Sequence, residues 1–103
     1  MTFEVAEGAR QDLAAVIRFY DAQPTRHGAD VRAEFERAAV AIAANPRMYS
    51  PVEDEYPGVE AREFLIARFS QRVIYTVEGE SDRVIAVVHA SRRPGSWHRR
   101  LTP

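Results

Sequence analysis

The sequence predicts one α+β domain, in which an antiparallel hairpin of two helices covers one face of an antiparallel sheet. Three observations predict this fold: a short alternating stretch at the N-terminus, two consecutive segments with helical spacing of apolar residues, and three further alternating segments. The 103 residues are enough for one hydrophobic core and too few for two. With 46% hydrophobic and 28% charged residues, residues 1–103 have the composition of a single folded domain.

The N-terminal part of the chain changes from the period of a strand to that of a helix. Residues Thr2 to Ala6 alternate between apolar and other residues, which predicts a short strand. From Glu7 to Gln23 the apolar residues lie three or four positions apart, which predicts a helix that ends before Pro24 and Gly28. The apolar stripe of this helix consists of Leu13, Val16, Ile17 and Tyr20.

A second amphipathic helix is predicted from about Ala29 to Ala44. It ends at Asn45-Pro46, because the residue before a proline disfavours the helical value of ψ. Since only a few residues separate the two helices, we expect them to pack as an antiparallel hairpin. The inner face of the second helix consists of Val31, Phe35, Ala38, Ala39 and Ile42.

Residues 47–60 have no apolar period and contain two prolines, which predicts a loop. Three acidic residues, Glu53, Asp54 and Glu55, follow one another in this loop. Neighbouring carboxylates rarely converge on one metal ion without a glycine-bounded loop, so we interpret the acidic cluster as solvated.

The C-terminal half predicts a three-stranded antiparallel meander, because three alternating segments are joined by short turns. Residues Val84 to Val88 are apolar at every position, as in an interior strand. The three strands are expected at Arg62 to Phe69, Gln71 to Glu78 and Asp82 to Ala90.

The middle strand shows which face of the sheet meets the helices. Its alternation places Val73, Tyr75 and Val77 on one face, which we expect to pack against the helical hairpin. The other face, with Arg72 and Ile74, is then expected to be exposed and to be the functional surface.

The charge is divided unevenly, although the net charge is only −1. Residues 1–59 hold six Arg and ten acidic residues, whereas residues 60–103 hold eight Arg and five acidic residues. The positive C-terminal half indicates an anionic partner, either nucleic acid or an acidic protein segment. Cysteine and lysine are absent, which excludes thiol chemistry and catalysis by a lysine of adjusted pKa. No apolar run is long enough to cross a membrane and no signal peptide is visible, so a cytoplasmic protein without a membrane partner is expected.

Four stretches together are typical of one known family. The order and spacing of these stretches across residues 3–101 resemble the RelE/ParE toxins, also called plasmid stabilisation proteins, and look closer to the ParE-like branch. The stretches are Ala9-Arg10-Gln11-Asp12-Leu13, then Ala44-Asn45-Pro46, then Arg62-Glu63-Phe64 leading to residues 72–77, and finally residues 84–94 with Trp97.

This resemblance implies the toxin of a type II toxin-antitoxin system, neutralised by a cognate antitoxin in a hetero-oligomer. The ParE-like branch inhibits DNA gyrase by binding it, which implies growth inhibition without an enzymatic activity or a cofactor. The alternative is a RelE-like endonuclease that cuts mRNA on the ribosome. A further alternative is a non-toxic binding module with the same fold.

Candidate catalytic residues follow from comparing the resemblance with the needs of RNA cleavage, namely a general base, a general acid and cations that stabilise the phosphorane. Arg72 matches the arginine that cleaving members place on a central strand. Arg92 or Arg93 matches the one that follows the last strand, and Arg92 is taken as the candidate. Only Glu63 and His98 could replace the acid-base groups of cleaving members, and His98 is the candidate because its ordinary pKa is close to neutral. The lack of Lys and of a C-terminal Tyr favours the binding account over the enzyme.

Candidate partner-binding residues surround the sole Trp of the chain. An aromatic residue among arginines can anchor a protein partner, and Trp97 can equally pack into the core. Three scattered histidines without a carboxylate at ligand spacing predict no metal site. The partner-binding candidates are Arg93, Trp97, Arg99 and Arg100.

Overall fold

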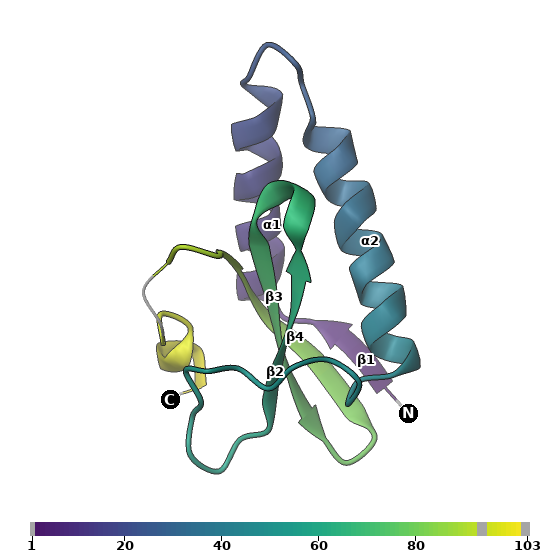
Figure 1. The fold of residues 1–103 in the computed structure, drawn as a ribbon, viewed down its shortest axis with the longest axis vertical. Helices are drawn as coiled ribbons and strands as arrows, with labels where there is room; N and C mark the ends of the chain where they lie inside the picture. The colour runs from purple at the N-terminus through teal and green to yellow at the C-terminus, as the bar shows by residue number, and fades with distance from the viewer. Residues whose placement is uncertain (1, 93–94, 102–103) are drawn as a thin grey trace.

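The computed structural model describes residues 2–92 and 95–101, which form a helical hairpin and a four-stranded sheet (Figure 1). The predicted α+β fold and its order of strand, helix, helix and three strands are confirmed. The predicted strand from Arg62 to Phe69 is wrong at its end, because the strand stops at Ile66 and Ala67–Phe69 form a 3₁₀ helix. The elements are β1 Thr2–Val5, α1 Glu7–Asp21, α2 Gly28–Ala44, β2 Ala61–Ile66, β3 Gln71–Glu78 and β4 Ser81–His89, with short 3₁₀ helices η1 Ala67–Phe69 and η2 His98–Leu101.

The sheet is mixed, with the strand order β1-β4-β3-β2. Strands β2, β3 and β4 form the predicted antiparallel meander, whereas β1 pairs in parallel with β4, from Thr2 opposite Ser81 to Val5 opposite Val84. Because β1 is shorter than β4, the end of β4 after Val84 has no neighbouring strand on that side. The backbone groups on this open edge bond to side chains of α1 and of the C-terminal segment instead.

The helical hairpin turns at residues 22–27, and in Figure 1 its tip extends beyond the end of the sheet. The carboxylate Oδ1 of Asp21, the last residue of α1, accepts a hydrogen bond of 2.9 Å from the backbone N–H of Gly28, the first residue of α2. A Cβ at residue 28 would lie 2.2 Å from this oxygen, so any other residue here would push the Asp21 side chain out of this position. In the described ranges no helix is long and apolar enough to cross a membrane.

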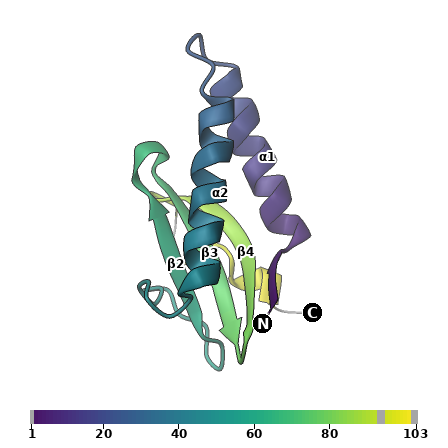
Figure 2. The same ribbon diagram turned by 90° about the vertical axis from the view of Figure 1, so that its right-hand side faces the viewer.

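One face of the sheet packs against α1 and α2, as Figure 2 shows from the side. Val73, Tyr75 and Val77 lie in this core, as the alternation of β3 predicts. The Tyr75 hydroxyl donates a hydrogen bond of 2.5 Å to the Pro46 carbonyl oxygen, and burial raises the pKa of Tyr75 to about 12. The buried members of this core are Ala9, Val31, Phe35, Ala38, Ile42, Ile66, Phe69, Val73, Tyr75, Val77, Val84 and Val87.

The opposite face of the sheet is not the exposed functional surface that the sequence predicts. A second apolar core covers it, closed by the loop after α2 and by residues 95–101, so the expectation of a single core is wrong: the sheet divides the apolar residues between its two faces. Trp97 is the largest side chain of this core and is only 1% exposed. The buried members are Val52, Ala61, Ile74, Ile85, Ala86, Val88 and Trp97.

A β-bulge in β4 distributes its apolar run between the two cores. The register passes from Ile74 opposite Ala86 to Tyr75 opposite Val84, which leaves Ile85 without an opposite residue. Ile85 and Ala86 therefore both belong to the second core, although they are neighbours in sequence. Because both faces of the sheet are covered, every residue of the run from Val84 to Val88 is buried.

Candidate functional site

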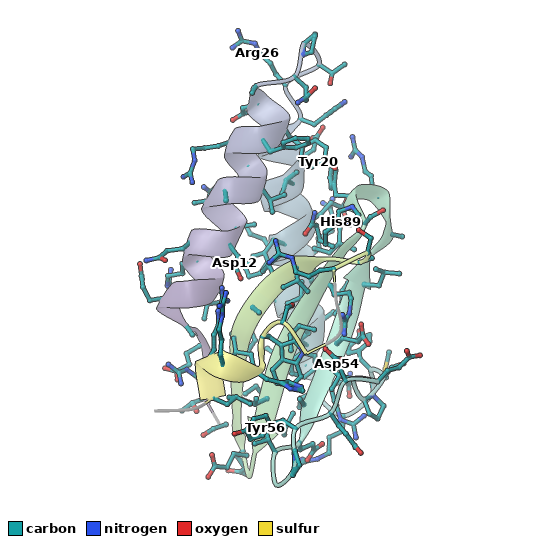
Figure 3. All side chains as sticks on the ribbon, turned by 90° about the vertical axis from the view of Figure 1, so that its left-hand side faces the viewer. Asp12, Tyr20, Arg26, Asp54, Tyr56 and His89 are labelled. Carbon is teal, nitrogen blue, oxygen red and sulfur yellow. The ribbon has the colours of Figure 1, made fainter. Side chains whose placement is uncertain are left out.

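A single carboxylate, that of Asp54, joins the acidic loop, the sheet and the C-terminal segment (Figure 3). Its Oδ2 accepts hydrogen bonds from the backbone N–H of Gly95 at 2.7 Å and from the indole N–H of Trp97 at 2.6 Å. Its Oδ1 accepts one from the Arg72 guanidinium at 2.9 Å. The main-chain oxygen of Asp54 accepts another from the Nε2 atom of His98. These contacts bind residues 95–98 to the sheet.

The interpretation of the acidic cluster as solvated is therefore wrong for Asp54, whose side chain is 3% exposed. Burial raises the pKa of this carboxyl, but the hydrogen bonds from Gly95, Trp97 and Arg72 outweigh burial and hold the pKa below its ordinary value. Asp54 is thus ionised at neutral pH. Its flanking residues Glu53 and Glu55 are exposed, and no local sequence signal distinguishes the three acids.

Arg72, the first predicted catalytic residue, is already paired with carboxylates. Its Nε donates to Glu63 at 2.6 Å, in addition to the bond from its Nη2 to Asp54, and its side chain is 12% exposed. Burial lowers the pKa of Arg72, but the two carboxylates outweigh it and raise the pKa above its ordinary value. A phosphate group would have to displace these carboxylates to reach the guanidinium.

Arg72 and Arg92 line one pocket of about 310 Å³, so the structure brings two of the three predicted catalytic residues together. The pocket contains three carboxylates and two guanidinium groups, which leaves a formal charge of −1 and disfavours an anionic substrate. Its lining consists of Glu53, Asp54, Glu63, Leu65, Arg72, Ala90 and Arg92.

His98, the third predicted catalytic residue, lies outside this pocket lining. Its ring makes edge contacts with Trp97, at 4.4 Å between centroids, and with Tyr56, at 5.3 Å. The Nε2 atom is bound to the Asp54 carbonyl, and Nδ1 would lie 3.2 Å from a Cβ placed on Gly95. The Nε2 atom is therefore occupied by a backbone acceptor.

Arg100 forms a second attachment of the C-terminal segment, to helix α1. Its guanidinium donates to both carboxylate oxygens of Asp12, at 2.6 and 2.8 Å, and to the carbonyl of Ile85 at 2.8 Å. Asp12 Oδ2 also accepts the backbone N–H of Val87 at 2.9 Å. Asp12 and Arg100 thus satisfy the backbone groups that β4 exposes beyond the end of β1.

The predicted partner-binding residues occupy different environments. Trp97 is buried in the second core and Arg100 is held by Asp12, whereas Arg99 is exposed. Arg93 lies outside the described residues. The roles of these four residues in binding a partner remain predictions.

Histidines and carboxylates form no apparent metal site in the part of the chain that the structure describes, where no three metal-ligating side chains converge. His27 pairs with Asp30 at 2.9 Å, and His89 with the Ser91 hydroxyl at 2.7 Å. One more buried acid, Asp82, is 2% exposed, and its Oδ2 has no hydrogen-bond partner among the described residues. Burial raises the pKa of Asp82.

Comparison with known families decides the identity of the fold. The sequence matches, over residues 3–94, the model of the family described as "ParE toxin of type II toxin-antitoxin system, parDE". The chain belongs to the ParE toxin family. The resemblance seen in the sequence is thereby confirmed, and this ParE-type protein is a toxin of a toxin-antitoxin system. No curated protein sequence matches it.

A solved structure supports the ParE fold independently of sequence. The chromosomal ParDE toxin-antitoxin system from P. aeruginosa contains a chain that superposes with a TM-score of 0.73, covering 88% of this chain and 97% of that one. The two sequences are only 15% identical, so this likeness concerns the fold. That neighbour is described as a toxin-antitoxin system.

Proposed function

We propose that this ParE-type toxin inhibits DNA gyrase by binding it, without an enzymatic step, and is neutralised by a cognate antitoxin. One observation carries the non-enzymatic part: Arg72, the central cation expected of a cleaving member, is held by Asp54 and Glu63 at 2.9 and 2.6 Å. A cation that stabilises a transition state must be available to the charge that develops there. The ParE family supports gyrase as the target.

The acid-base groups support the same proposal. RNA cleavage requires a proton acceptor and a proton donor within hydrogen-bond reach of the substrate. His98 is the acid-base candidate of the described C-terminal segment, and its Nε2 atom is bound to the Asp54 carbonyl. Glu63, the other candidate, is paired with Arg72. Lysine, which could otherwise supply an acid-base group, is absent from the sequence.

The RelE-like alternative is favoured by one observation, that Arg72 and Arg92 share a pocket of about 310 Å³. If both arginines stabilise a phosphorane, Arg72→Ala should lower the cleavage rate by roughly a hundredfold or more. Under the binding account Arg72 serves only to hold Glu63 and Asp54. The non-toxic binding module remains the further alternative.

The deciding experiment induces the toxin in cells and follows DNA breakage and mRNA integrity side by side. Broken DNA with intact mRNA is the expected result, together with inhibition of purified gyrase by the purified toxin. Rapid cleavage of mRNA at ribosomal A sites, with DNA synthesis continuing, would overturn the proposal.

The antitoxin part of the proposal has a separate test. The gene next to the toxin gene should encode a small protein that co-purifies with the toxin and restores growth, as expected of a plasmid-stabilising pair in the cytoplasm. We expect the interface to bury on the order of 1,600 Å² or more, the size of a stable complex. If the product of the adjacent gene fails to bind the toxin or to restore growth, the antitoxin part of the proposal is contradicted.

A further inference from the structure

A narrow crevice lies between helix α1 and the C-terminal segment, on the side of the molecule seen in Figure 3. It has a volume of about 210 Å³, and the upper part of β4 forms its floor. It is distinct from the pocket of Arg72, although Arg92 lies at the boundary of both. The polar residues of its lining are Asp12, Gln71, His89, Arg92, Ser96, Arg99 and Arg100.

The crevice is positive in a chain whose net charge is −1. Three guanidinium groups and one carboxylate line it, which leaves a formal charge of +2 with His89 neutral. The carboxylate belongs to Asp12, whose two oxygens both accept hydrogen bonds from Arg100. Within the described residues Arg92 forms no ion pair, so its charge is available to a ligand.

The crevice also contains a deeply placed amide. Gln71 is only 6% exposed, and its Nε2 donates to the Phe69 carbonyl at 3.2 Å. An amide nitrogen carries two hydrogens, and no acceptor among the described residues takes the second. His89 Nδ1 accepts the backbone N–H of Ser91, so a neutral His89 carries its proton on Nε2 and is a donor too.

We propose that this crevice binds one carboxylate side chain from an acidic segment of a protein partner. This inference rests on the proposed function only in that such a toxin must bind proteins. A guanidinium and an amide N–H are the donors that a carboxylate takes, and the volume of about 210 Å³ suits one side chain.

Nucleic acid fits the surroundings less well than an acidic peptide. The sequence has a pI of about 6.3, whereas nucleic-acid-binding domains typically have basic surfaces and a pI above about 9. The adjacent pocket, with a formal charge of −1, would repel the successive phosphates of a strand. An isolated carboxylate beside neutral residues meets no such repulsion.

The test is an NMR titration of the purified toxin with a blocked peptide, acetyl-Gly-Glu-Gly-Glu-Gly-amide. We expect saturable shifts of the Gln71 side-chain amide and of the Trp97 indole N–H. Arg92→Gln should raise the Kd by about tenfold, since a hydrogen bond to a charged group is lost. Arg18→Gln is the matched control, because it removes the same charge from an exposed residue of α1 outside the crevice.

Two results would overturn the inference. One is equal weakening of peptide binding by Arg92→Gln and Arg18→Gln, which would indicate a diffuse charge effect. The other is tighter binding of a single-stranded decanucleotide than of the peptide at equal ionic strength. Because the titration contains neither gyrase nor antitoxin, its outcome is independent of the cellular test of the proposed function.

Discussion

The two faces of the sheet are covered in different ways. On one face the helices α1 and α2 bury a mainly apolar core, with the Tyr75 hydroxyl as a hydrogen-bonded polar group. On the other face a smaller core is closed by a segment of seven described residues, 95–101, which polar contacts from Asp54 and Asp12 hold in place. The first face is therefore stabilised mainly by the apolar area that the helices bury. On the second face the apolar core is smaller, and a few hydrogen bonds to charged groups hold its cover in place.

The largest effect is expected on the helix-covered face. Ile42→Ala should lower the free energy of unfolding by about 2–5 kcal/mol, because it leaves a cavity at a fully buried position. Val40→Ala, on the same helix but 71% exposed, should change it by less than about 0.5 kcal/mol. Urea denaturation followed by circular dichroism measures both, and similar losses for the two variants would contradict the assignment of this core.

The second largest effect should come from Asp54→Asn, which removes the charge that Arg72 and Trp97 bind. We expect a loss of about 2–4 kcal/mol, with Glu53→Gln as the exposed control. Because the folded pKa of Asp54 lies below the ordinary 3.8, its contribution is complete above pH 3.8 and is lost as the pH falls through the folded value. The difference between wild type and variant in urea midpoint should therefore shrink below pH 3.8. A constant difference would show that the charge of Asp54 is not the source of the lost stability.

A smaller loss, about 1–2 kcal/mol, is expected for Arg100→Gln, whose guanidinium is 36% exposed and therefore partly screened by solvent. Arg92→Gln is the matched control and should change stability by less than about 0.5 kcal/mol. Hydrogen exchange of the Val87 amide gives a local readout, since this N–H is bound by Asp12. Unchanged protection of Val87 in Arg100→Gln would show that Asp12 needs no support from the C-terminal segment.

The smallest effect is a gain. Asp82→Asn should raise the free energy of unfolding at pH 7 by on the order of 1 kcal/mol, because a buried carboxylate oxygen without a partner becomes uncharged. The folded pKa of Asp82 is raised above 3.8, so its cost is absent below pH 3.8 and grows as the pH rises through the folded value. Thermal melts of both proteins at pH 3.5 and pH 7 test this, and a gain of equal size at both values would refute the titration as its cause.

The order of elements and the helix-covered core could be predicted because their signals are local. The helical spacing around Leu13 and the alternation around Tyr75 are each contained in a few residues. The second core could not be predicted in the same way, because the contacts of Asp54 with Gly95 and Trp97 span 41 and 43 positions. The bulge at Ile85 could not be predicted either. A run that is apolar at every position shows no alternation between apolar and polar residues that a bulge would interrupt.

The residues of the candidate site came from the family resemblance and not from a local pattern. The resemblance selected Arg72 and Arg92, and the structure gives them a common pocket. Their carboxylate partners come from a loop without a period, so the sequence does not show that Arg72 is neutralised. The crevice beside α1 depends on how residues 95–101 lie across the sheet, which no local pattern determines.

The salt bridge between Asp12 and Arg100 also affects the order in which parts of the chain fold. It joins residues 88 positions apart, so the chain must close almost its whole length before the bond can form. Contacts of such long range generally form late in folding, after local helices and hairpins. Until then the open edge at the end of β4 lacks the donor that Arg100 supplies to the Ile85 carbonyl. The interval before this closure is when the nascent toxin is most prone to pair with a strand of another chain.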